Sequence, residues 1–181
     1  MQVGCQHGPG GKSDPGLSDE ESRSHFGSWA IVSSPLTLSH DVNDDTISDK
    51  IWPIISNTEA LEVSQAYFGF SGGPFKQATE KVLLTDSFIE SNEAEEAVSA
   101  PSNQFLYKPM SWEGKKTAVL AMNSDSSTKS LGFSFKDVPG LTCTTCNVRD
   151  IWAHKDLGSF TGQWSGSVAG HDAAFLVVTA A

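Results

Sequence analysis

The sequence predicts a protein of the α/β plus all-β class, in which the last units of a β/α barrel precede an antiparallel β-sandwich. Residues 18–65 have the pattern of a helix, a buried strand and a second helix, without a second strand to complete a sheet. From about Lys81 onward, short strand-like segments alternate with turns. A parallel strand with two flanking helices buries its apolar faces only between neighbouring units of the same kind. We therefore expect most of the barrel to lie upstream of Met1, which we interpret as an internal methionine of a longer protein.

The first expected helix begins at a capping box, Ser18-Asp19-Glu20-Glu21. The Ser18 hydroxyl can accept a hydrogen bond from the Glu21 amide, and the Glu21 carboxylate can accept one from the Ser18 amide. Acidic residues in this first turn also suit the positive end of the helix dipole. The helix is expected to run to about Val32, because Pro35 cannot continue it. Its buried stripe consists of Phe26, Trp29 and Ala30.

A short strand is expected at residues 36–39, followed by a polar turn at residues 40–43. A second helix is expected around the isoleucines of residues 47–55. We expect it to be kinked or split, because Pro53 lacks the amide proton that a helix interior needs. Asn57 is expected to cap a further turn of helix.

The composition changes at residues 68–74, Phe-Gly-Phe-Ser-Gly-Gly-Pro, which are typical of a linker. We therefore expect two domains, with the end of the barrel at residues 1–75 and an antiparallel β-sandwich at residues 76–181. Residues 86–103 are acidic, have little apolar periodicity and are expected to form a solvated loop. The expected strands are residues 81–84, 104–108, 117–123, 131–136, 145–150 and 173–179.

The chain carries an excess of negative charge, with 22 acidic and 12 basic residues and a net charge of -10. Binding to nucleic acid needs a basic surface that neutralises phosphates, so this class of partner is excluded. No membrane partner is expected either, because the longest apolar run, residues 173–178, is far too short to span a bilayer. A neutral ligand such as a sugar is indifferent to this charge. No glycine-rich phosphate-binding motif follows a strand, and no cofactor is expected.

Three cysteines are present, and two of them form the motif Cys143-Thr-Thr-Cys146. A zinc site would need a second pair of cysteines or nearby histidines at suitable spacing, and none is obvious, so no metal is expected. The motif lies between strand-like segments rather than at the start of a helix, which disfavours a thioredoxin-type redox site. A short disulfide or two unreactive thiols remain as alternatives.

Hydrolysis of a glycosidic bond needs two carboxyl groups that face each other across the bond. Asp41, Asp44 and Asp45 follow the expected strand at residues 36–39, and in a β/α barrel the loops after the strands form the active-site face. Asp41 is therefore a candidate, although a role in a turn or a helix cap is favoured for it, and more strongly for the other two. His40 lies on the same face and is a candidate for ligand contact.

Five tryptophans occur in this chain, and exposed indoles can stack on sugar rings. Trp29 and Trp152 fit core positions, and Trp52 fits an interface. Trp112 and Trp164 lie near turns, where an indole could form a platform for a sugar. Packing at the rim of the core is the favoured interpretation for both.

Several segments share patterns with one known family. Residues 22–31 contain the pattern R-x-H-F-x-x-W-A, which continues as Ser-Pro-Leu-Thr-Leu at residues 34–38 and His-Asp-Val at residues 40–42. Residues 54–59, Ile-Ile-Ser-Asn-Thr-Glu, are similar to the pattern I-L-S-N-x-E. Residues 148–152, Val-Arg-Asp-Ile-Trp, are similar to R-D-L-W. Together these segments resemble the melibiase (α-galactosidase) family of retaining glycoside hydrolases over nearly the whole chain.

This resemblance implies the last part of a (β/α)8 barrel with a C-terminal β-sandwich, and an α-galactoside as substrate. The family's two catalytic aspartates lie on earlier barrel strands, so the resemblance implies no catalytic residue in this chain. Met1-Gln2-Val3-Gly4 is similar to the second half of the family's P-D-M-L-x-V-G element, which makes Met1 a substrate-binding residue. Asp41 and His40 would support the sugar pocket from behind the residues that touch it. A secreted, vacuolar or lysosomal location is also implied.

The chain departs from the family at two positions. Asn43 stands where an arginine is frequent, and Ala66 replaces the aspartate of a V-N-Q-D pattern that residues 63–65 begin. Two alternatives stay open. The chain could serve as a non-catalytic structural or carbohydrate-binding module, or it could belong to a related α-N-acetylgalactosaminidase.

Overall fold

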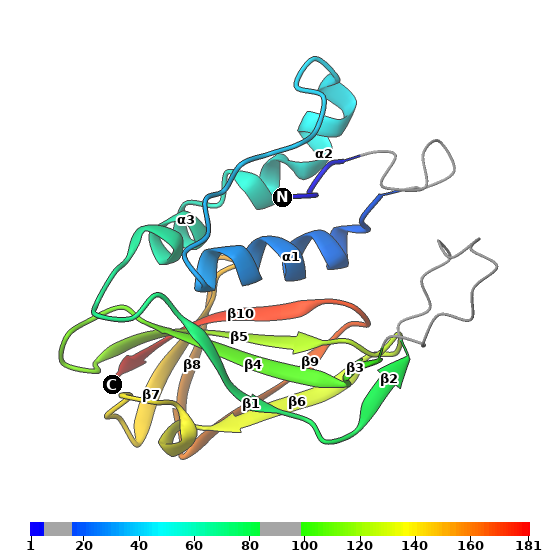
Figure 1. Cartoon of the computed structure of the whole chain (residues 1–181). Helices are drawn as coiled ribbons and strands as arrows, with labels where there is room; N and C mark the ends of the chain where they lie inside the picture. The colour runs from blue at the N-terminus through cyan, green and yellow to red at the C-terminus, as the bar shows by residue number, and fades with distance from the viewer. Residues whose placement is uncertain (6–15, 84–98) are drawn as a thin grey trace.

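The computed structural model describes residues 1–5, 16–83 and 99–181. Within these ranges a layer of helices covers one face of a large antiparallel sheet (Figure 1). The helices are α1 (Asp19–Ile31), α2 (Asp45–Ile55) and α3 (Thr58–Gln65). Most of the acidic segment predicted at residues 86–103 lies outside the described residues, as does position 84 of the first predicted strand.

The predicted helix starts are confirmed. The Glu21 amide donates to the Ser18 hydroxyl at 3.2 Å, and the Ser18 amide donates to the Glu21 carboxylate at 2.8 Å, which completes the capping box. The Asn57 side chain accepts hydrogen bonds from the first amides of α3, those of Glu59 at 3.1 Å and Ala60 at 3.0 Å. Both caps satisfy amides that have no partner inside the helix.

The strand predicted at residues 36–39 was wrong. These residues form no ladder with another strand among the described residues, and the Thr37 amide instead donates to the Pro35 carbonyl at 2.9 Å. A strand needs neighbours as well as a suitable residue pattern. The second helix is neither split nor interrupted, although Pro53 lies inside it. Pro53 lies in its last turn, so its missing amide proton removes a single helical hydrogen bond near the end.

The β-sandwich is confirmed and consists of antiparallel strands. The large sheet has the order β1-β4-β5-β10-β7-β8, and β6 pairs with β9 in a second sheet (Figure 1). A short ribbon joins β2 (Lys81–Leu83) to β3 (Ser99–Pro101). The large sheet contains β1 (Gly73–Gln77), β4 (Asn103–Pro109), β5 (Lys116–Asn123), β10 (Ala173–Ala180), β7 (Thr145–Asp150) and β8 (Lys155–Thr161). The second sheet contains β6 (Lys129–Ser134) and β9 (Gln163–Val168).

The strand predicted at residues 131–136 ends earlier than expected. It stops at Ser134, and Phe135–Asp137 form a turn of 3-10 helix. Phe135 is still buried, so its apolar character reflects the core rather than strand pairing. The strands β1, β3, β8 and β9 were not predicted.

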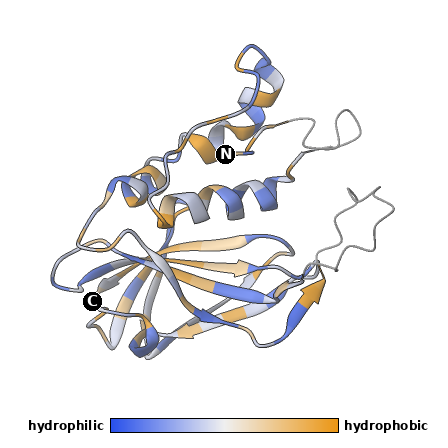
Figure 2. Cartoon of the chain, in the orientation of Figure 1, coloured by the Kyte–Doolittle hydropathy of each residue, from blue (hydrophilic) through white to orange (hydrophobic). Residues whose placement is uncertain are grey.

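Two apolar layers lie on either side of the large sheet. The first lies between the helices and the sheet, and the second lies between the two sheets. The central strand β10 contributes to both, because Phe175 faces the helices while Leu176 and Val178 face the second sheet. Burial on both faces explains the continuous apolar run of this strand, which Figure 2 shows in orange. The first layer includes Phe26, Ala30, Ile51, Val63, Leu120, Ile151 and Phe175.

The helical layer therefore shares a core with the sandwich. The strand β1 begins at Gly73 and pairs with β4, so the large sheet extends across the boundary predicted between residues 75 and 76. The division into two domains stays a prediction.

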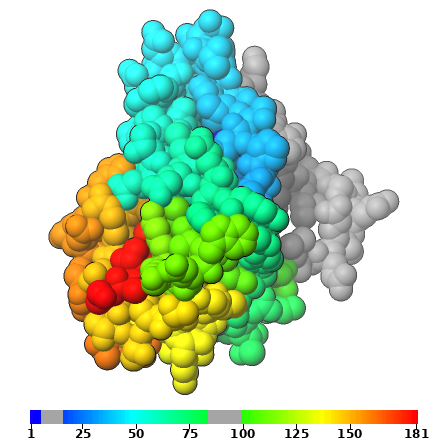
Figure 3. Space-filling model, turned by 90° about the vertical axis from the view of Figure 1, so that its left-hand side faces the viewer, coloured from blue at the N-terminus to red at the C-terminus, as the bar shows by residue number. Residues whose placement is uncertain are grey.

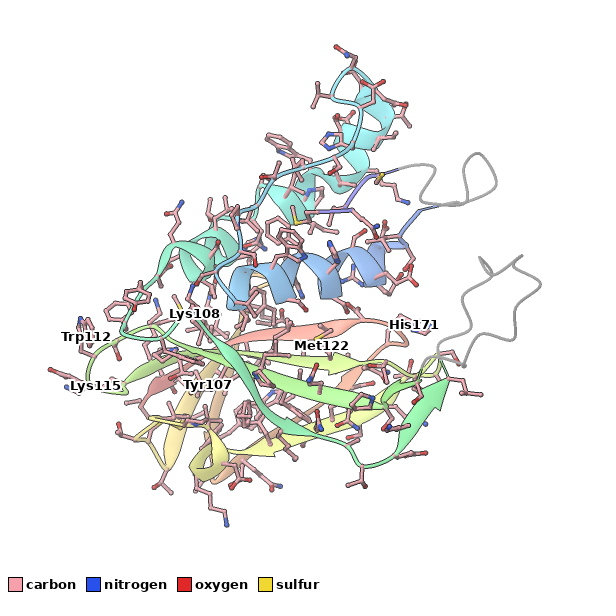
Figure 4. All side chains as sticks on the ribbon, in the orientation of Figure 1. Tyr107, Lys108, Trp112, Lys115, Met122 and His171 are labelled. Carbon is pink, nitrogen blue, oxygen red and sulfur yellow. A yellow bond between two sulfur atoms is a disulfide. The ribbon has the colours of Figure 1, made fainter. Side chains whose placement is uncertain are left out.

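A buried lysine joins three segments of this fold. The Lys108 side chain leaves β4, is 0% exposed and lies between the sheet and the helices (Figure 4). Its ammonium donates to the carbonyl oxygens of Val63 at 2.5 Å and Ser64 at 2.9 Å, in the last turn of α3. It also donates to the Ser33 hydroxyl at 2.7 Å, just after α1. The cation thus satisfies free carbonyls at the negative end of a helix dipole.

A second polar contact holds the start of α3 on the sheet. Arg149 of β7 donates to both carboxylate oxygens of Glu59, at 2.7 and 2.9 Å, and to Asp156 at 3.0 Å. His154 Nδ1 lies 2.7 Å from the same carboxylate of Glu59. The hydrogen bonds from Arg149 are the main reason why the pKa of Glu59 is lowered, and Glu59 in turn raises the pKa of Arg149. Asn57 adds a hydrogen bond to the Ile151 carbonyl at 3.0 Å.

Replacement of Lys108 by methionine should destabilise the fold by about 2–3 kcal/mol, because the apolar stem is kept while buried carbonyls lose their donor. Burial lowers the pKa of Lys108 to about 8, so the ammonium is charged at neutral pH, where the test belongs. Urea unfolding followed by circular dichroism measures the change. The control is Lys115→Met, on the turn that follows β4. The Lys115 side chain is exposed and pairs with Glu113, so this substitution should lower the free energy of unfolding by less than about 0.5 kcal/mol. Equal effects of the two substitutions would contradict the role given to Lys108.

The Glu59 contact should make stability depend on pH. The lowered pKa means that this stabilisation is complete above the ordinary glutamate value near 4.5 and is lost as the pH falls through the lowered value. Glu59→Gln should therefore cost about 1–2 kcal/mol at neutral pH, and the difference from the unsubstituted chain should shrink on acidification. Thermal unfolding at a series of pH values measures this. Glu62→Gln is the matched control on the same helix, because Glu62 is exposed and pairs with Lys116. A gap that stays constant with pH would show that Glu59 acts by packing alone.

Candidate functional site

The residues predicted to line or support a sugar pocket lie at one end of the helical layer. The N-terminal amine of Met1 donates to the Thr37 carbonyl at 3.0 Å, so the first described residue lies beside the segment at residues 36–39. Gly4 has a φ of +74° and packs against His40 and the helix α2. A Cβ at this position would lie 2.6 Å from the Ile51 side chain, so only glycine fits.

His40 and the aspartates have mainly local contacts. The Asp41 carboxylate accepts from the Asn43 amide at 3.0 Å and from the Asn43 side chain at 3.2 Å. Asp44 is the cap of α2 and accepts from the Ile47 amide at 3.1 Å. These are the turn and cap roles that were favoured from the sequence. His40 Nδ1 is buried without a hydrogen-bond partner among the described residues.

At this end of the molecule the carboxylates of Asp41 and Asp44 accept from nearby backbone amides. Among the residues that the structure describes, no group of three His, Cys, Asp or Glu side chains could hold a metal ion. In the same ranges, no helix has the length and apolar character needed to cross a bilayer. Cys143 and Cys146 are joined by a disulfide at the start of β7.

The tryptophans divide between core and surface. Trp164 is buried and Trp152 packs against Phe26 and Phe175. Trp112 does not fill the rim of the core, because 75% of it is exposed on the turn between β4 and β5, where it touches Phe68 (Figure 4).

The segments that carry the family resemblance contact one another. On α1, the Arg23 guanidinium donates two hydrogen bonds to the Asp172 carboxylate, at 3.0 and 2.7 Å. This bidentate contact fixes the helix to the turn before β10. His25 accepts from the Gln2 amide at 3.1 Å, and burial lowers its pKa, which keeps the imidazole neutral as an acceptor needs. Phe26 packs edge-on against Trp152 of the segment at residues 148–152, with ring centroids 6.4 Å apart. These motif residues hold the helices on the sheet.

A polar hollow, which we call the α3 groove, was not predicted from the sequence. It has a volume of about 600 Å³ and lies where α3 meets the uncovered end of the large sheet. Glu59 and Glu62 of α3 form one wall. Lys116, Val177 and Thr179 of β5 and β10 line it from the sheet. Figure 3 faces this region, where α3 in cyan-green meets the red end of β10 and the orange strands of the β7–β8 hairpin. The hairpin contributes Asn147, Val148, Arg149, Asp156 and Gly158.

Comparison with known proteins supports the family resemblance. Residues 102–178 match the model of the alpha galactosidase C-terminal beta sandwich domain. The chain is 34% identical over 164 residues to a probable alpha-galactosidase B of Penicillium simplicissimum, an alignment that covers 90% of this chain and 34% of that protein. The chain thus spans about one third of the length of the curated relatives it matches.

Solved structures show the same fold. Alpha-galactosidase I of Mortierella vinacea superimposes with a TM-score of 0.67 and 21% identity, over 91% of this chain and 38% of that one. The structure of the alpha-galactosidase of Saccharomyces cerevisiae with raffinose superimposes with a TM-score of 0.73 and 14% identity, over 100% of this chain and 46% of that one. The chain therefore belongs to the α-galactosidase family, as a C-terminal part that carries the family's β-sandwich.

Proposed function

We propose that this chain is the C-terminal portion of an exo-acting, retaining α-galactosidase whose two catalytic aspartates lie upstream of Met1. The observation that carries this proposal is the similarity to α-galactosidases over nine-tenths of the chain. The local use of Asp41 and Asp44 supports it, because both carboxylates accept hydrogen bonds from nearby backbone amides, as turn and cap residues do.

In the proposed reaction, one upstream aspartate attacks the anomeric carbon while the other protonates the departing glycosidic oxygen. Water then releases the sugar with the second aspartate acting as base. Met1 would line the galactose pocket. Asp41 would hold the turn after residues 36–39 through Asn43, and His40 would keep a buried ring nitrogen available for a group supplied by the rest of the pocket.

The alternative within the same family is an α-N-acetylgalactosaminidase, which differs in how the pocket reads the C2 substituent. The residues that would do so lie upstream in this proposal. The proposed compartment is secreted, vacuolar or lysosomal, and the disulfide between Cys143 and Cys146 is consistent with an oxidising environment.

The purified chain should release no nitrophenol from 4-nitrophenyl α-galactoside, because it supplies neither the nucleophile nor the acid. A complete fungal α-galactosidase assayed beside it provides the positive control. Steady turnover that follows the chain through purification and disappears in its Asp41→Ala variant would overturn the proposal.

In the complete protein, Asp41→Ala should lower kcat/KM by about tenfold, because the turn beside the pocket loses its two hydrogen bonds from Asn43. Asp45→Ala is the matched control, since Asp45 is exposed in the first turn of α2 and should leave kcat/KM unchanged. The assay compares galactoside with N-acetylgalactosaminide to separate the two candidate activities. Equal losses at Asp41 and Asp45 would argue against a supporting role for Asp41.

A further inference from the structure

The large sheet continues beyond the helices that cover it, and its uncovered end is polar. On the helix-facing side of β10, Phe175 is buried beneath the helical layer, whereas Thr179 lies in the α3 groove. An uncovered sheet face meant for another protein layer would carry apolar side chains here. The change in character along one strand indicates a surface built to meet a polar ligand.

The strand register places four polar side chains in one row. Thr179 of β10 is paired with Lys116 of β5 on one side and with Asn147 of β7 on the other. Asn147 is paired in turn with Ser159 of β8, whose hydroxyl donates to the side-chain oxygen Oδ1 of Asn147 at 2.5 Å. Because this contact uses the oxygen, the Asn147 amide donors stay available, and within the described residues the Thr179 hydroxyl has no side-chain partner. The row thus offers donors and acceptors at the spacing of adjacent strands.

The walls of the groove are held in place by contacts across it. Glu59 is fixed by Arg149, and Glu62 accepts from Lys116 at 2.6 Å. Since α3 is capped by Asn57 at one end and by Lys108 at the other, the groove is formed before any ligand arrives. A preformed site lowers the entropic cost of binding.

The charges lining the groove favour a neutral ligand. Three carboxylates, those of Glu59, Glu62 and Asp156, face two cations, Lys116 and Arg149. Both cations already bind carboxylates, so a phosphate or another anion would have to compete with them. Val177 provides apolar surface between these polar groups. A sugar ring combines hydroxyl groups with an apolar C–H face and matches this arrangement.

We propose that the α3 groove binds a neutral pyranoside, and its volume of about 600 Å³ lies within the range of small-molecule sites. The choice of sugar rests on the proposed function, because the substrates of that function are galactosides. The groove would hold a terminal or internal galactosyl unit of a longer substrate.

The test titrates the isotope-labelled chain with methyl α-D-galactopyranoside and follows its backbone amides by NMR. Saturable shifts should map to residues 116, 147–149, 158 and 179. The double variant Asn147→Ala/Thr179→Val should weaken binding by about tenfold or more, since two neutral hydrogen bonds are lost while the fold is kept. An unchanged amide spectrum outside the groove verifies that the variant is folded.

Trp112→Ala provides the matched control, because this exposed indole lies outside the groove on the neighbouring turn. It should leave the affinity unchanged. A sugar that binds at Trp112 and ignores the double variant would overturn the assignment, as would the absence of saturation at the solubility limit of the sugar. Because no turnover is measured, binding in the groove can be established even if the complete protein proves not to hydrolyse galactosides, and the reverse also holds.

Discussion

The fold depends on polar contacts that hold short helices on one face of the large sheet. These helices would not be stable without the sheet. The helix α3 has only eight residues, too few to be stable in water by itself. Its start is fixed by Asn57 and its end by the ammonium of Lys108, which also reaches Ser33 after α1. Gly72 lies against the Ile31 carbonyl, where a Cβ would come within 1.9 Å, so the chain entering β1 passes directly beneath α1. A lysine in this position is stable only because each of its protons meets an oxygen.

The family motifs are recognisable for the same reason. Arg23 binds Asp172, which lies 149 positions away in the sequence, and Arg149 binds Glu59, which lies 90 positions away. The charged residues of such pairs can be recognised in the sequence as parts of the family motifs. The sequence alone does not show which of them contact each other. Their contacts became visible only with the fold.

Local chemistry explains how much of the structure could be predicted. Caps at Ser18 and Asn57 involve neighbours three residues away and were predicted correctly. The strand β9 was missed because Gly166 occupies the position where alternation would require an apolar residue. The Trp164 ring covers that space, and a Cβ on Gly166 would lie 2.6 Å from it. The strand β1 was missed because Gly73 and Pro74 are typical of a linker, yet an edge strand with a register shift after Pro74 tolerates both. The α3 groove was missed because its row of polar residues comes from four strands that only the register brings together.

Many of the acidic residues in this chain are engaged in contacts that hold the fold. The net charge of -10 suggests many free carboxylates, but those at the important positions are engaged. Asp41 and Asp44 bind backbone amides, Asp172 binds Arg23, and Glu59 binds Arg149. A carboxylate oxygen that already accepts from a cation or a backbone amide is engaged in holding the fold and is less available to a substrate. The same pairing leaves the α3 groove rich in hydrogen-bonding atoms and nearly balanced in charge, a surface that suits hydroxyl groups better than ions.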